Sequence, residues 1–196
     1  IRVPGFRSTH PQRAEAFASA LRDHLASQAK SGACGWIIDL RDNTGGNMYP
    51  MIRGLSGLLG GETLGWFVHR HEREAWNARQ AGVGDRGLQA LPGGTTAPVA
   101  VLQGPRTASA GEATLLSFMG RPKTRRFGQP SQGLSTGNQP FPLVDGAALA
   151  ITTSVMADRS GRAYGGKIPP DETVEIDEAT ETTALRWLRQ QPGCAG

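Results

Sequence analysis

Ser109 is the residue in this sequence whose type and position best suit nucleophilic chemistry. It lies in the segment 107–112 (TASAGE), after an apolar run and among small residues that would leave its hydroxyl accessible. Backbone N–H groups at a helix N-terminus stabilise developing negative charge, which suits a nucleophile. The spacing of Ser109 and Glu112 also describes a capping box. On these residues alone, the capping interpretation is favoured, because caps are common and nucleophiles are rare.

A glycine-rich junction is the second candidate for chemistry. Residues 39–46 (DLRDNTGG) follow a short apolar run and end in Gly45 and Gly46. Glycines allow backbone N–H groups to face an anion. A tight turn that requires positive φ explains the same residues and is favoured on spacing alone. The pattern is not a dinucleotide-binding fingerprint, and it lacks the lysine of a phosphate-binding loop.

A nucleophilic serine normally needs a base within hydrogen-bond reach. The chain has four histidines, His10, His24, His69 and His71. None has a convincing acidic partner nearby in the sequence, and we expect all four to be solvated surface residues. These residues therefore identify a candidate nucleophile without its base.

The hydrophobic periodicity predicts the elements that would position these junctions. Helices are predicted over 11–31, 51–58 and 109–120, and strands over 35–40, 63–69, 97–102, 124–127, 139–143 and 148–155. The pair Gly60-Gly61 is expected to end the second helix. Residues 72–96 are polar and glycine-rich, and we interpret them as an exposed excursion. Alternating strands and helices indicate an α/β domain with a mostly parallel sheet.

Composition limits the class of protein. The 196 residues are 38% hydrophobic and 19% charged, which fits one globular domain, 1–196, with no run long enough to span a membrane. The net charge is +4, but the basic residues are scattered and aromatics are 6%, so nucleic acid is not an expected partner. The opening residues resemble a strand cut from a longer protein, and we expect the chain to be a fragment.

The two cysteines, Cys34 and Cys194, lack the spacing of a zinc site. They could pair in an oxidising compartment, or they could be two buried free thiols. The residues alone leave this choice open.

Several segments, in this order, resemble the C-terminal processing (tail-specific) serine peptidases, a family related to the tricorn core. They are 37–46 (IIDLRDNTGG), 107–112 (TASAGE), 128–133 (GQPSQG), 145–147 (DGA), 157–162 (ADRSGR) and 168–171 (IPPD). Each segment is weak alone, but the ordered set spans nearly the whole chain. Segments 116–120 (LSFMG) and 137–139 (GNQ) are most similar to the branch of nisin resistance proteins.

The resemblance implies a Clp-protease/crotonase-like core with flanking helices. It implies that Ser109 is the nucleophile and that the backbone N–H of Ala110, with that of Gly45 or Gly46, forms the oxyanion hole. It implies no metal and no organic cofactor. The PDZ domain found in some members is not visible in this sequence.

One position departs from the family pattern. Many members use a lysine as the base, and Leu134 stands at that position, 25 residues after Ser109. Leucine cannot accept a proton. The resemblance therefore implies the other arrangement, in which a histidine upstream of this chain is the base.

The resulting prediction is a serine peptidase core that cleaves peptides or protein C-terminal tails through an acyl-enzyme on Ser109, with the isolated chain inactive. Two alternatives remain: a non-catalytic module that binds peptides or hydrophobic ligands on the same fold, and a crotonase-type enzyme acting on acyl thioesters. The family is typically extracytoplasmic, so a periplasmic or secreted location is expected, with a membrane anchor possible through missing upstream residues. An oligomer is compatible with the sequence.

Overall fold

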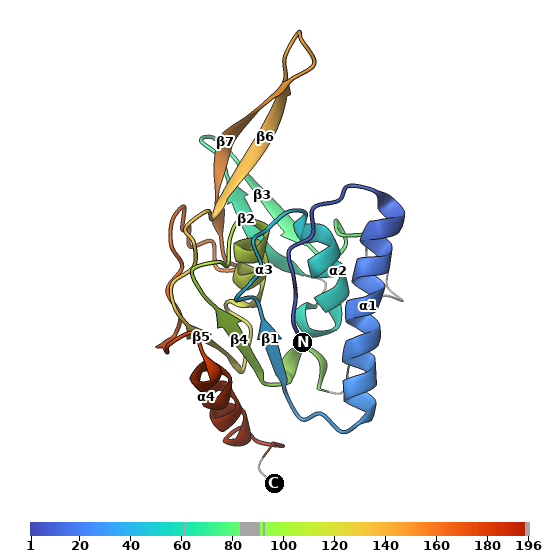
Figure 1. Cartoon of the computed structure of the whole chain (residues 1–196), viewed down its shortest axis with the longest axis vertical. Helices are drawn as coiled ribbons and strands as arrows, with labels where there is room; N and C mark the ends of the chain where they lie inside the picture. Colours follow the sequence, from blue (N-terminus) through green and yellow to red (C-terminus); the bar gives the residue numbers. More distant parts are fainter. Residues whose placement is uncertain (61, 83–90, 92, 195–196) are drawn as a thin grey trace.

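The computed structural model describes residues 1–60, 62–82, 91 and 93–194 of the chain. Figure 1 shows the arrangement of the helices and strands. The elements are α1 (Pro11–Lys30), β1 (Trp36–Asp39), α2 (Met48–Leu59), β2 (Thr63–Val68), β3 (Arg73–Asn77), the short 3-10 helix η2 (Gly94–Thr96), β4 (Val99–Gln103), α3 (Ala110–Phe118), β5 (Thr124–Gly128), β6 (Thr136–Pro142), β7 (Ala148–Ala157), β8 (Glu172–Thr173) and α4 (Glu178–Arg189).

One sheet is parallel throughout, with the strand order β1-β4-β5-β8. Strand β4 lies inside this sheet, and all five of its residues are buried. Val99 and Val101 belong to the core cluster on one face, whereas Ala100 and Leu102 belong to the cluster on the other. A strand covered on both faces reads as a continuous apolar run, so the parallel sheet was predictable from the sequence.

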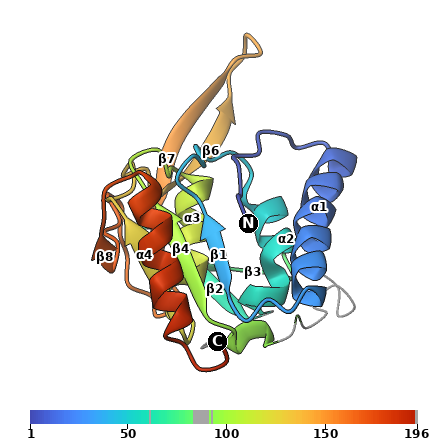
Figure 2. The same cartoon turned by 60° about the horizontal axis from the view of Figure 1, so that its bottom comes forward.

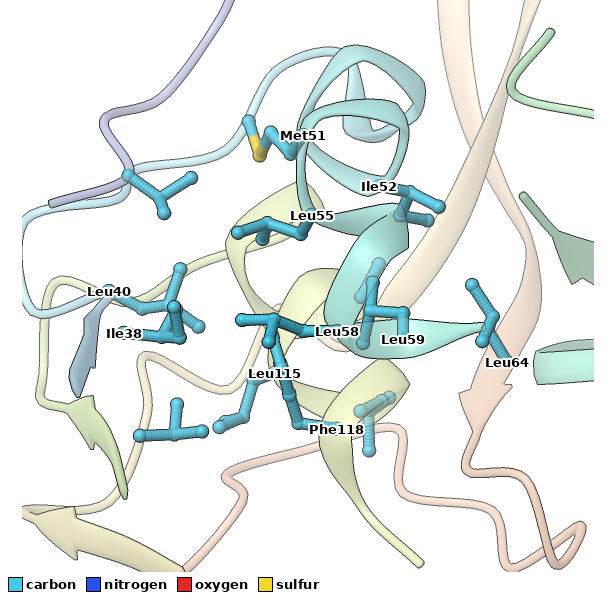
Figure 3. Packing of buried hydrophobic residues seen from close by; sticks show 14 of the residues in the cluster. Ile38, Leu40, Met51, Ile52, Leu55, Leu58, Leu59, Leu64, Leu115 and Phe118 are labelled. Atoms are coloured by element: carbon cyan, nitrogen blue, oxygen red, sulfur yellow. The ribbon is translucent and has the colours of Figure 1, made fainter. Parts of the chain in front are cut away.

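The larger core lies between this sheet and helices α2 and α3, and α1 packs on the outside of α2 (Figures 1 and 2). Figure 3 shows Leu55 and Leu58 of α2 lying toward Ile38 of β1 and Leu115 of α3. All four side chains are fully buried. Burying one such side chain contributes about 1.5–3 kcal/mol, so α2 is held mainly by this face.

Helix α2 begins and ends at residues suited to these positions. The Asn47 side chain accepts a hydrogen bond from the Tyr49 N–H at 3.1 Å, as a helix cap should. Gly60 follows the last turn with φ +81°, a conformation that glycine adopts at little cost. Gly60 thus ends the helix as predicted, and Gly61 lies outside the described residues.

A second sheet is antiparallel, with the order β3-β2-β7-β6. The prediction of an exposed excursion over residues 72–96 is wrong for its first part, because β3 pairs with β2 there. Trp76 of β3 is fully buried, and its indole N–H donates to Ser117 Oγ at 3.0 Å. Residues 83–90 and 92 of the same prediction lie outside the described residues.

The hairpin formed by β6 and β7 extends away from the body of the protein (Figures 1 and 2). Only the end of β7, at Val155–Ala157, pairs with β2. Most of the hairpin is therefore a two-stranded ribbon.

Helix α4 covers the second face of the parallel sheet through Ala184 and Leu188 (Figure 2). A disulfide between Cys34 and Cys194 joins the segment before β1 to the segment after α4, with the Cα atoms 5.2 Å apart. The structure thus has the paired form of the two cysteines. No helix among the described residues is long and apolar enough to cross a membrane.

Candidate active site

The two junctions singled out in the sequence lie against each other. One follows β1, and the other joins β4 to α3. The Thr107 hydroxyl donates to the Leu40 carbonyl at 2.8 Å, and the Ala108 N–H donates to the Asn43 carbonyl at 2.9 Å. Both strands belong to one parallel sheet, so their carboxyl ends meet at one edge, where ligand sites of α/β sheets gather.

Gly45 of the first junction lies close to the backbone of the second. It has φ +95°, and a Cβ atom placed on it would lie 2.9 Å from Ser109 Cβ and 3.2 Å from the Ala110 nitrogen. Real Cβ atoms essentially never come so close to another carbon, so only glycine allows this contact. The glycine of the first junction therefore brings its backbone directly beside the candidate nucleophile.

Ser109 has an unusual backbone conformation. Its φ is +51° and its ψ is −114°, a combination disfavoured for residues with a Cβ atom. Such strain costs about 1–3 kcal/mol and persists only where the surroundings hold the residue, often at functional sites. Ser109 is half-buried at the N-terminus of α3, in the position that a nucleophile would need.

The Glu112 side chain holds the backbone conformation of Ser109. Its carboxylate is fully buried and accepts the Ser109 N–H at 2.8 Å, the Ser131 hydroxyl at 2.6 Å and the Gly133 N–H at 3.0 Å. Burial raises the pKa of the Glu112 carboxyl, and the hydrogen bonds from these donors oppose the rise. The capping interpretation and the nucleophile interpretation are thus compatible, because the cap fixes the backbone of Ser109.

Two backbone donors near Ser109 are open. The Gly45 N–H donates to Asn43 Oδ1 at 3.0 Å, so this N–H already has a partner. Within the described part of the chain, neither the Gly46 N–H nor the Ala110 N–H makes a hydrogen bond. Of the donors named from the sequence, Ala110 and Gly46 are therefore the two available to a ligand.

The described residues contain no evident base for Ser109. Leu134 is 52% exposed in the loop before β6. His10, His24 and His71 are exposed, and His69 is half-buried in the turn between β2 and β3.

Lys167, which does not stand at the position of the family lysine, lies near the site. A Cβ placed on Gly133 would lie 3.0 Å from Lys167 Cγ, so the lysine stem packs over the residue that contacts Glu112. Lys167 comes from the loop before β8, 33 residues further along the chain than the dyad position. No local spacing in the sequence could have indicated this contact.

The described residues include no group of three or more His, Cys, Asp or Glu that could hold a metal ion. The groups that the described residues bring together at this site are the Ser109 hydroxyl, the open N–H groups of Gly46 and Ala110, and the buried Glu112 carboxylate.

Comparison with known proteins places this geometry in a family. Residues 1–174 match the sequence model of Peptidase family S41. The nisin-resistance protein of Lactococcus lactis subsp. lactis is 32% identical over 197 residues, a match that covers 97% of this chain and 60% of that protein. The chain thus spans about three fifths of its curated relative.

Two solved structures have the same fold. A lipoprotein from Streptococcus agalactiae superposes with a TM-score of 0.83 and 30% identity, covering 96% of this chain and 65% of that one. The photosystem II D1 C-terminal processing protease has a TM-score of 0.69 and 19% identity, covering 91% of this chain and 44% of that one. The expected α/β fold is confirmed, and the chain belongs to peptidase family S41.

Proposed function

We propose that this chain is the nucleophile-bearing core of a serine peptidase. A base takes the proton from the Ser109 hydroxyl as its Oγ attacks the scissile carbonyl carbon of a peptide. The base then gives that proton to the leaving amine as the C–N bond breaks and an ester forms on Ser109. Water, activated by the same base, hydrolyses the ester and releases the acyl product.

The observation that carries this proposal is the contact between Gly45 and Ser109. Each junction alone could be only a turn or a helix cap. Their contact supports the interpretation that the two junctions form one site. The strained backbone of Ser109 supports it further, since a plain capping serine needs no positive φ.

The oxyanion of the tetrahedral intermediate would be held by the N–H groups of Ala110 and Gly46. These are the two donors near Ser109 without a protein partner among the described residues, whereas the Gly45 N–H is engaged by Asn43. Removing one oxyanion-hole donor typically costs about 10²–10³ in kcat.

The base would be a histidine from a part of the protein upstream of this chain. Leu134 rules out the usual dyad at its position, and the relatives are longer than this chain. The location would be extracytoplasmic, because a disulfide persists in oxidising compartments and a structural relative is named a lipoprotein. The substrate would be a peptide or a protein C-terminal tail, as the name of the D1 processing protease suggests.

A fluorophosphonate probe tests the nucleophile on a longer form of the protein. We expect the probe to label Ser109 and the Ser109→Ala variant to be unlabelled and inactive. A matched control is Ser160→Ala, which changes an exposed serine in a different loop and should leave labelling unchanged. Equal labelling of the Ser109→Ala variant would refute the assignment.

A second candidate function is non-catalytic peptide binding, and the β6–β7 hairpin is the observation that favours it. Phe141 pairs with Leu149 across the strands, and Gln139 pairs with Ile151, so these side chains share one face of the ribbon. The three apolar members are 41–50% exposed. An extended apolar peptide is the occupant we consider, because the hairpin begins at Thr136, close to the Gly133–Glu112 contact beneath Ser109.

Such a peptide would bind the face of the hairpin and not its edge. Strand β6 is at the edge of the sheet, and it carries Pro140 and Pro142, which have no N–H to offer an added strand. Fluorescence titration of the Ser109→Ala protein with an apolar peptide distinguishes the functions. Two results together would favour the binding module. The fluorophosphonate would leave the parent protein, with Ser109 intact, unmodified, and Ile151→Ser would weaken peptide binding.

A further inference from the structure

Two arginines, the buried Arg121 and the half-buried Arg159, lie at the far end of α3 from Ser109. Arg121 is 5% exposed and donates to the carbonyls of Leu58, Pro122 and Gly94 and to Thr124 Oγ1. Arg121 follows the C-terminal end of α3, and one of its acceptors, Leu58, lies in the last turn of α2.

Arg159 approaches the same helix ends from the loop after β7. Its Nε and Nη2 donate to the Ser117 carbonyl, and Nη2 also donates to the Leu59 carbonyl. The carbonyls at a helix C-terminus carry partial negative charge, so they explain why arginines are held here. They do not explain why two full positive charges are placed together.

The helix carbonyls do not use all the donors of the two guanidinium groups. Each guanidinium has five N–H groups. The described residues provide acceptors for four of those of Arg121, and they provide none for Nη1 of Arg159. Neither arginine forms a salt bridge with a carboxylate of the described chain. Burial and, secondarily, the nearby charge of Arg159 lower the pKa of Arg121 to about 10. Burial also lowers the pKa of Arg159, and the charge of Glu62 opposes that shift.

A cavity opens beside these unused donors. Its volume is about 780 Å³, and it is lined by Glu62, Thr63, Asn77, Gly120, Arg121, Pro122 and Arg159. Helix α3 has nine residues between Ser109 and this end, so the cavity lies about 13 Å along the helix axis from the nucleophile. It is therefore separate from the candidate active site.

We propose that this cavity is a binding site for a phosphate group. A phosphate offers several acceptor oxygens around one centre, which suits a cavity lined by both Arg121 and Arg159, each with unused N–H groups. Arginine forms strong charge-assisted hydrogen bonds with phosphate. Thr63 and Asn77 add polar groups to the wall. Glu62 is the one acidic residue of the described lining; it is exposed and would oppose the anion.

The ligand could be free phosphate or the headgroup of an anionic lipid, which present the same chemistry. Thermal unfolding of the protein in inorganic phosphate, compared with chloride at equal ionic strength, tests the shared site. Co-sedimentation with phosphatidylcholine vesicles, with and without phosphatidic acid, tests the lipid source. We expect phosphate to raise Tm in a concentration-dependent manner, as a ligand specific to the native state does.

Arg159→Gln should weaken phosphate binding by roughly tenfold or more, because it removes charge-assisted hydrogen bonds. Arg106→Gln, which changes an exposed arginine at the other end of α3, is the matched control and should bind as the parent does. Phosphate stabilisation no greater than that of chloride, or equal in the parent and Arg159→Gln, would overturn the proposal.

Two variants keep the test decisive if Arg159→Gln does not fold, because neither removes a helix-capping arginine. Asn77→Asp keeps the oxygen that accepts the Gln80 N–H but adds a negative charge to the cavity wall, so phosphate binding should weaken several-fold. Glu62→Gln removes the opposing charge, so binding should tighten. If neither Asn77→Asp nor Glu62→Gln alters the stabilisation by phosphate, the ion binds elsewhere and the proposed site is wrong.

Discussion

The buried carboxylate of Glu112 accepts the N–H of Ser109 at 2.8 Å, and it thereby fixes the backbone of the residue proposed as nucleophile. Its other oxygen is shared by Ser131 and Gly133, which lie in the loop leading to the β6–β7 hairpin. One side chain thus ties the start of α3 to that loop. A change at Glu112 should affect the position of Ser109 and the stability of the fold together.

Glu112→Gln should lower the free energy of unfolding by about 1–3 kcal/mol, because an amide has a single acceptor oxygen and leaves a buried N–H group without a partner. In a longer form that contains the proposed base, we expect kcat to fall as well, because Ser109 is displaced. Urea unfolding and peptide hydrolysis measure the two effects. Glu178→Gln, at an exposed glutamate of α4, is the control. A Glu112→Gln protein as stable and active as the parent would show that the carboxylate does not hold Ser109.

The raised pKa of Glu112 predicts a pH dependence. Its folded pKa lies above the ordinary value of 4.5, so the stability contributed by the neutral form is fully present below that value. It is lost as the pH rises through the folded pKa. Stability relative to Glu112→Gln, which does not titrate, should therefore fall with increasing pH above about 4.5 and then become constant. Denaturant unfolding of both proteins across this range measures it, and an opposite slope would contradict the burial effect.

The strained backbone at Ser109 predicts a difference between two inactive variants. Ser109→Ala keeps a Cβ atom at φ +51° and loses a capping group, at a cost of about 1 kcal/mol. Ser109→Gly should be more stable than Ser109→Ala by about 1–3 kcal/mol, because glycine removes the strain. Thermal or urea unfolding compares them. Glycine is usually the destabilising choice near a helix, so a less stable Ser109→Gly would show that the strain is absent.

The sequence predicted β1, β4 and β5 of the parallel sheet and the first three helices because their apolar residues recur locally, and it did not predict the two-residue strand β8. It missed β3 because the burial of Trp76 depends on a partner strand. Trp76 lies opposite Gly65, where a Cβ atom would come within 2.2 Å of the indole ring. Only a glycine in β2 leaves room for that ring. The residue pattern within 73–77 does not indicate this contact, because the glycine belongs to another strand.

The candidate site shows the same limit. Ser109, Ala110 and the two glycines were named through a family resemblance, and their proximity follows from the adjacency of β1 and β4 in the sheet. The Gly45 N–H is not open to a ligand, because it donates to the Asn43 side chain. Such a contact requires the backbone geometry of the turn and cannot be predicted from residue types.

The disulfide predicts a strong dependence of stability on oxidation. Cys34 and Cys194 are separated by 160 residues, so the cross-link restricts a long loop of the unfolded chain. In the chain-entropy account, its loss should lower the free energy of unfolding by about 3–5 kcal/mol. Urea unfolding with and without reductant measures this, with the double Cys34→Ser, Cys194→Ser variant as the reductant-insensitive control. Two reactive thiols in the denatured, unreduced protein would show that the pair does not form.

Finally, the 196-residue chain alone should be catalytically silent, and a longer form that includes an upstream histidine should cleave peptides. Without a base, a serine nucleophile retains only the rate enhancement of binding and the oxyanion hole, several orders of magnitude below the full activity. Assays of both forms on an unstructured peptide library at neutral pH measure the difference. Substituting the upstream histidine by alanine should inactivate the longer form as completely as Ser109→Ala does.

Lys167→Met tests one alternative base among the described residues, because the stem of Lys167 packs against Gly133, whose N–H donates to Glu112. If the short chain cleaves peptides in a Ser109-dependent manner and Lys167→Met abolishes that activity, the base is Lys167 and the proposed histidine is wrong.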